Sequence, residues 1–179
     1  MRLSQVGGIL VVAGSVSFLL GFVGPGVFVV AGLLLCGFGA LIVAAIDRYP
    51  LCGPAVRLGL GGLGLGLLSG AAGGIIEALA LGSGTDPLAT PALFFTFVAL
   101  MLTIIGLALT GVVLAMRAGP TRIPGGLLVA GLVSIAAAIG TGSGRDILVP
   151  AGLLIVITGG AWVGGLAVAA PEDGSPSTD

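Results

Sequence analysis

Residues 58–81 read LGLGGLGLGLLSGAAGGIIEALAL, an apolar run interrupted only by glycine, one serine and one acid. The hydrocarbon core of a bilayer is about 30 Å thick, and a helix of about 20 mostly apolar residues crosses it. This run therefore predicts a transmembrane helix. Within it, glycine recurs at every fourth position, namely Gly62, Gly66, Gly70 and Gly74. Such a glycine zipper is typical of membrane helices that pack closely, because only small residues let two backbones approach each other.

The composition of the whole chain extends this interpretation to the rest of the protein. The chain has 179 residues, of which 57% are hydrophobic and 7% are charged, and its mean hydropathy is +1.29. Soluble domains carry about 25% charged residues. Six basic and seven acidic side chains are too few to cover the surface of a soluble protein of this size. The sequence predicts an integral membrane protein whose surroundings are the lipid bilayer.

Five further apolar runs are long enough to span, and with the first they predict an all-α bundle of six transmembrane helices. The predicted spans are 3–22, 27–46, 58–81, 92–116, 123–140 and 148–170. They form a single transmembrane domain over 1–170, because no linker is long enough to build a core of its own. The Pro/Ser/Asp-rich tail 171–179 is expected to be disordered and cytoplasmic.

The placement of arginine predicts the orientation, because cytoplasmic loops of membrane proteins are enriched in positive charge. With the N-terminus inside, only Arg145 lies outside, and the other arginines lie inside: Arg2, Arg48, Arg57, Arg117 and Arg122. Both termini are then cytoplasmic. We expect a multi-pass protein of the plasma membrane.

Two of the predicted outer loops share a pattern. Residues 82–86 read GSGTD and residues 142–146 read GSGRD. This likeness predicts an internal repeat, in which the six helices are three helical hairpins of the same orientation; the alternative is ordinary turn chemistry, since Gly, Ser and Asp are common in turns. The layout resembles the HdeD-type acid-resistance membrane proteins in span number and in glycine and proline placement. That resemblance includes no motif, so it implies no role for any residue.

Small residues also line faces of other predicted spans. In the last span, Gly160 and Gly164 lie beside a row of small residues, and we expect both glycines to pack against a neighbouring helix. The span 92–116 is bulkier, and its threonines lie seven apart on one face: Thr96, Thr103 and Thr110. We expect these hydroxyls to bond to carbonyls of their own helix. The alternative is that they line a polar path.

Glu77 is the only ionisable residue well inside a predicted span. Acids in such positions are rare and are candidates for a functional role. Glu77 lies 20 residues after Arg57, or about 30 Å along a helix, which places it near the outer boundary of the hydrocarbon. Three interpretations stay open: a structural pair with Arg145, a proton or cation site, or a hydrated carboxylate. The outer-loop acids Asp86 and Asp146 are too scattered to predict a metal site.

The residue inventory restricts the function classes. The chain has no histidine, so triads and dyads that use histidine as a base are excluded. Cys36 and Cys52 match no metal-binding spacing, and the net charge of −1 excludes a nucleic-acid surface. We therefore expect no enzyme activity, no cofactor and no bound metal. The sequence favours a structural or assembly bundle that packs against a second copy or another membrane subunit; the alternative is a channel or transporter for a small solute, proton or cation that uses Glu77.

Overall fold

The computed structural model describes residues 3–45, 53–86, 90–117, 119–141 and 145–169, but not the side chains of 141, 145 and 146. These residues form six helices and no strand. The helices are α1 (Leu3–Gly21), α2 (Val27–Ala45), α3 (Pro54–Ser83), α4 (Ala92–Met116), α5 (Arg122–Thr141) and α6 (Arg145–Ala169). All six are long and apolar enough to cross a membrane. The predicted all-helical fold with six long apolar helices is thus confirmed, and it is compatible with a multi-pass membrane protein. The predicted tail 171–179 lies outside the described residues.

The ends of the helices follow from local chemistry. Pro54 opens α3 at a position where its missing N–H is not needed. At the other end, Gly84 adopts a left-handed conformation with φ 71°, and its N–H bonds back to Leu81 O at 3.3 Å. α6 begins three residues before the predicted span, so Pro150 lies inside this helix and not in its first turn. Proline is most common in the first turn of a helix, and Pro150 departs from that placement.

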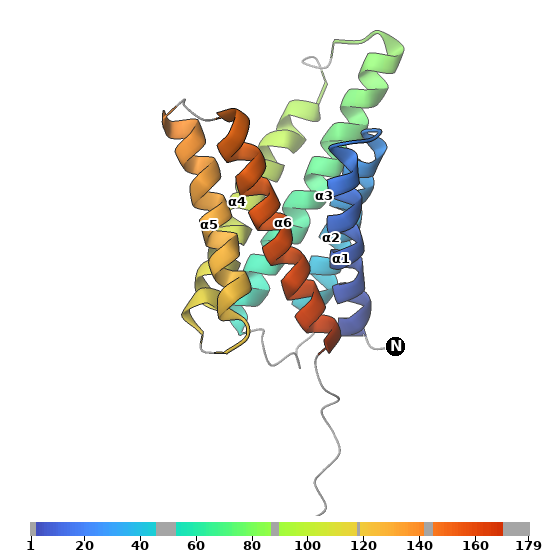
Figure 1. Ribbon diagram of the computed structural model, residues 1–179. Coiled ribbons are helices and arrows are strands. Elements are labelled where there is room, and N and C mark those ends of the chain that lie inside the picture. Colours follow the sequence, from blue (N-terminus) through green and yellow to red (C-terminus); the bar gives the residue numbers. More distant parts are fainter. Residues whose placement is uncertain (1–2, 46–52, 87–89, 118, 142–144, 170–179) are drawn as a thin grey trace, which may run out of the picture.

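The six helices form a closed ring. Each helix packs against the next along the chain, and α6 packs against α1, as the ribbon shows (Figure 1). Neighbours run antiparallel, because Gly7 faces Gly39 while Gly14 faces Gly32. Within the described ranges, no two helices on opposite sides of the ring share an extensive contact. The fold is therefore a single layer of helices around one axis.

The two ends of this ring differ. We call the end where α1, α3 and α5 begin the closed end, and the opposite end the open end. At the closed end, side chains from four helices meet in an apolar core, namely Val43, Val56, Leu60, Leu114 and Ala167. At the open end, the buried hydrophobic residues are alanines: Ala71, Ala80, Ala92 and Ala138. Among the described residues, the cluster of large buried side chains thus lies near the closed end.

α3 projects beyond its neighbours at the open end. Gly73 faces the carbonyl of Ala92, the first residue of α4, and Gly74 faces Val30 in the first turn of α2. α3 continues to Ser83, about three further turns. Figure 1 shows this extension rising above the other helices.

Candidate functional site

The contact between α3 and α4 is lined by glycines seven residues apart. Gly59, Gly66 and Gly73 of α3 face the three threonines of α4, which are Thr110, Thr103 and Thr96 respectively. A Cβ on Gly66 would lie 2.5 Å from Thr103 Oγ1 and 2.7 Å from its backbone nitrogen. No side chain larger than hydrogen fits there without moving a backbone. We call this set the α3–α4 glycine interface.

The spacing of seven has a geometric cause. Residues seven apart on a helix return to within about 20° of the same direction, whereas residues four apart drift by about 40° at each step. A contact that runs along an antiparallel neighbour therefore follows the seven-residue row. The predicted row at spacing four is divided between neighbours. Only Gly66 lies in the close interface; a Cβ added to Gly62, Gly70 or Gly74 would have its nearest neighbour at 3.8, 3.5 or 3.7 Å respectively, which is ordinary contact.

Close contacts between glycines recur at each helix pair around the ring. At each helix contact, a glycine of one helix lies against the backbone of a glycine on the next. A Cβ added to one member would lie 2.5–3.3 Å from the partner's carbonyl oxygen for the pairs Gly8/Gly164, Gly14/Gly32, Gly37/Gly64, Gly59/Gly106, Gly111/Gly125 and Gly131/Gly152. Such close approach brings Cα–H groups onto carbonyl oxygens, a weak but recurrent contact between helices. Gly164 thus packs on α1, whereas Gly160 has open space within 4 Å.

The hydroxyl groups of the spans are mostly used within their own helices. Thr96 Oγ1 donates to Ala92 O at 3.0 Å, and Ser15 Oγ donates to Val11 O at 2.8 Å. Ser134 and Thr158 donate to Ala130 O and Leu154 O in the same way. Thr110 is fully buried, and its Oγ1 has no hydrogen-bond partner in the described part of the chain. The threonine row of α4 faces the tightly packed glycines of α3, which leaves no room for a polar path along it.

Glu77 lies on the projecting part of α3. It follows Gly73 by one turn, so its side chain lies beyond the start of α4, and it is exposed. The proposed partner Arg145 begins α6, a helix that packs against α5 and α1, whereas α3 packs against α2 and α4. Figure 1 shows the start of α6 and the end of α3 on different sides of the ring. The side chains of Arg145 and Asp146 lie outside the described residues, so the Glu77–Arg145 pair stays a prediction.

The described acidic side chains do not form a cluster that could bind a metal ion. Among the described residues, no group of three Asp, Glu, Cys or His side chains could hold a metal ion. Asp86 is exposed after the end of α3, three residues past Ser83. The structure therefore brings Glu77 and Asp86 to the same projecting segment but builds no ligand set from them.

Arginines cluster at the closed end and tie helix ends together. Arg57, in the first turns of α3, donates through Nε to Ala44 O at 3.0 Å, in the last turn of α2. A cation at a helix C-terminus satisfies a carbonyl that has no partner within its helix and interacts favourably with the helix dipole. A Cβ on Gly53 would lie 2.6 Å from Arg117 Nη2, so Arg117 reaches the start of α3. The predicted span 58–81 leaves Arg57 outside the helix; Pro54, a frequent first residue of helices, is the signal that includes it.

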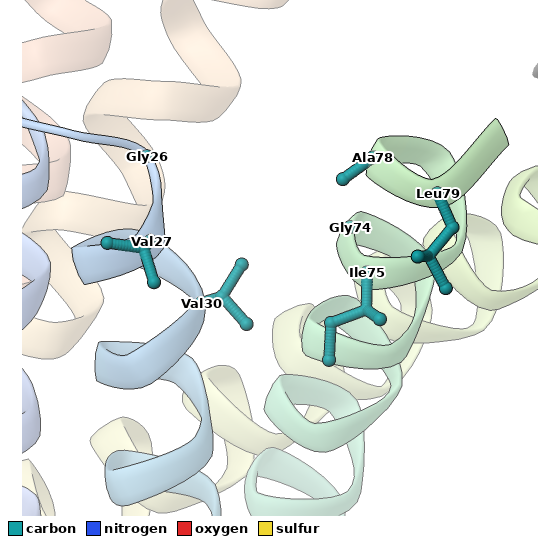
Figure 2. Close-up of a pocket in the computed structure, with 7 residues that line it drawn as sticks. All are labelled: Gly26, Val27, Val30, Gly74, Ile75, Ala78 and Leu79. Atoms are coloured by element: carbon teal, nitrogen blue, oxygen red, sulfur yellow. The ribbon is translucent and has the colours of Figure 1, made fainter. Parts of the chain in front are cut away.

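An apolar cleft separates α2 and α3 at the open end. Its volume is about 570 Å³, and its lining residues are Gly26, Val27, Val30, Gly74, Ile75, Ala78 and Leu79. Figure 2 shows Val27 and Val30 on one wall and Ile75, Ala78 and Leu79 on the other. Sequence reasoning missed this cleft, because its walls are ordinary apolar residues and it arises only from the divergence of two helices.

Comparison with known proteins shows no family for the chain. No family model matches it, and neither curated proteins nor solved structures give a match.

Proposed function

We propose that the chain, whose six apolar helices are compatible with a multi-pass membrane protein, is a structural or assembly component of the plasma membrane, oriented with both termini in the cytoplasm. The orientation is supported by the described arginines: Arg57, Arg117 and Arg122 belong to the closed end, where α1 also begins. The glycine contacts support the structural role, because they hold the ring together by backbone approach.

One observation carries the assembly proposal: the outward side of α5 carries small residues between the larger exposed side chains Ile123, Val133 and Ile139. Gly126 and Gly140 have open space where a Cβ would stand, and Ala130 between them is exposed. The outward side of α4 is bulkier, with exposed side chains such as Phe97, and Leu65 is exposed on α3. Small residues facing lipid gain little there, whereas they permit close helix–helix contact. A second copy of the chain, or another membrane subunit, packs on this face of α5.

Cysteine cross-linking in the bilayer tests the assembly. Ala130→Cys is placed in a chain whose native Cys36 and Cys52 are replaced by serine, and the matched control is Leu65→Cys on the outward side of α3. We expect oxidation to give a disulfide-linked dimer for the α5 variant and monomer for the control. Monomer from both, with full cysteine reactivity, contradicts self-association through α5 and leaves a different subunit as the partner to seek.

The second candidate function is a path for a small solute, proton or cation. It is supported by the closed ring, because a ring encloses an axis along which a path could run. At the closed end such a path meets Val56, Leu60 and Leu114, an apolar constriction of the kind that gates by excluding water. Flux into liposomes is compared for the wild type and Glu77→Gln. Flux lost in the variant supports a transport function using Glu77; no flux from folded protein of either kind supports the structural function.

A further inference from the structure

We propose that the cleft between α2 and α3 is a binding site for one hydrocarbon chain of a bilayer lipid. This site is independent of the α5 face through which assembly is proposed. It lies on the other side of the ring and is bounded by Val27 and Val30 of α2 and by Gly74, Ala78 and Leu79 of α3 (Figure 2).

The chemistry of the walls selects the occupant. All seven lining residues are glycine, alanine, valine, leucine or isoleucine. A water molecule held inside a protein needs two to four polar partners, about three on average, and these side chains offer none. The cleft is an open groove and not an enclosed void, since Val27 and Leu79 are largely exposed, so an apolar molecule from the surroundings can enter it and make dispersion contacts with the walls. The walls therefore favour an apolar occupant.

The position of the cleft makes a lipid chain the available filling. Val27, Ile75 and Leu79 belong both to the cleft and to the exposed surface, with 66%, 43% and 69% of their area accessible. The cleft is thus continuous with the surface that the membrane covers. α2 is 19 residues long, or about 28 Å, close to the thickness of the hydrocarbon. The cleft beside its first turn therefore lies at the outer boundary of the hydrocarbon, near Glu77, where an acyl chain enters the bilayer.

The two helices create the cleft because they diverge above their last close contact. Gly37 of α2 and Gly64 of α3 lie so close that a Cβ on Gly37 would stand 3.1 Å from the carbonyl oxygen of Gly64. Further along, a Cβ on Gly70 would lie 3.7 Å from Leu33 Cδ1. Above this level a Cβ on Gly74 would still lie 3.7 Å from Val30 Cγ2. Beyond that contact α3 keeps to α4 through Gly73, and Val27 of α2 faces Ala78 and Leu79 of α3 across the cleft.

A lipid with a photoactivatable diazirine in its acyl chain tests the site. Phosphatidylcholine of this kind is added in trace amounts to phosphatidylcholine vesicles that hold the full chain. The vesicles are exchanged into detergent before illumination, so that only retained lipid labels the protein, and labelled peptides are identified by mass spectrometry. We expect labelling at Val27, Val30 or Ala78 that exceeds labelling at the outward residue Leu65 several-fold.

Two variants fill the cleft, and a third serves as the matched control. Gly74→Leu and Ala78→Leu project into the cleft and should reduce its labelling several-fold. Gly61→Leu makes the same glycine-to-leucine change on α3 where the surroundings are open, and it should leave the labelling unchanged. Ala78→Leu keeps the test decisive if Gly74→Leu fails to fold. Equal labelling of cleft and outward positions, or labelling of the cleft by a water-soluble diazirine, overturns the proposal. A cross-link from the cleft to a second copy of the chain also overturns it.

Discussion

The two ends of the ring use the same helices but different packing. At the closed end, large side chains such as Leu60 and Leu114 are buried between helices, with 6% and 2% of their area exposed. At the open end, the buried hydrophobic residues are alanines, and α2 and α3 part to form the apolar cleft. In water, such an opening would be closed by the hydrophobic effect. In a membrane, lipid is as apolar as leucine, so a helix pair stays together only where its backbones can approach.

The glycine contacts explain how the ring closes through contacts between neighbouring helices. Each pair, such as Gly14/Gly32 or Gly131/Gly152, places one backbone against the next. The contact lies between neighbours and needs no side chain from across the ring. The core residues at the closed end then add a second layer of contact on top of the glycine pairs. Substitutions in each layer separate the two contributions to stability.

The largest effect is expected from Gly66→Leu in the α3–α4 glycine interface. A Cβ there already falls 2.5 Å from Thr103 Oγ1, so a leucine must push the helices apart. Overpacking costs about 1–3 kcal/mol and occasionally more, and we expect the upper end because the obstruction includes backbone. Unfolding in bicelles by heat or by denaturing detergent measures it. Gly61→Leu, on the same helix with nothing within 4 Å, should unfold like the wild type; equal losses from both would mean that the seven-residue row is not the contact.

A somewhat smaller loss is expected from Leu60→Ala in the core of the closed end. Removing a buried leucine side chain costs about 2–5 kcal/mol in water-soluble cores, and we expect about 2 kcal/mol here because lipid outside the ring weakens the transfer contribution. The matched change at the open end is Leu79→Ala, where 69% of the side chain is exposed. That variant should cost less than about 0.5 kcal/mol. A larger loss from Leu79→Ala than from Leu60→Ala would reverse the assignment of the two ends.

A third, still smaller effect is expected from Arg57→Met. The variant keeps the aliphatic part of the side chain but loses the hydrogen bond from Nε to Ala44 O. Hydrogen bonds to charged groups contribute about 1.5–3 kcal/mol, and the headgroup region offers water as a substitute, so a loss of about 1 kcal/mol is expected, similar to the effect of a favourable charge at a helix end. Arg122→Met, at an exposed arginine that begins α5, is the control. No difference between the two variants would mean that the bond to α2 adds no stability.

Much of this arrangement follows from the sequence, and the rest depends on the direction of contacts. Apolar length and composition predict six helices, and the predicted span 92–116 has the observed bounds of α4. Small residues predict that helices approach closely, but they do not say which neighbour each one faces. In α3 glycines recur both every four and every seven residues. The glycines seven apart stand out as the contact row only because they face threonines of α4 that are also seven apart. The cleft was not predictable, because divergence of α2 and α3 depends on where both helices stop touching.

The projection of α3 likewise depends on tertiary structure. Sequence distance from Arg57 predicts that Glu77 lies near the outer boundary of the hydrocarbon, but it does not show where the neighbouring helices start. The first residue of α4, Ala92, lies level with Gly73. This alignment takes Glu77 out of the helix contacts.

The smallest effect on stability is therefore expected from Glu77→Gln. The side chain is exposed beyond the start of α4, and surface substitutions away from special features stay within about 0.5 kcal/mol. Unfolding in bicelles at neutral pH measures this, with the isosteric change removing only the charge. A strong stabilisation would mean that a desolvated carboxylate had been removed, and a strong loss would mean that a partner had been deprived of its charge. Either result would mean that Glu77 is packed against other groups, and the open end would then not differ from the closed end in packing. An unchanged stability keeps the two ends distinct, and flux measured on the same variant then reports transport without interference from misfolding.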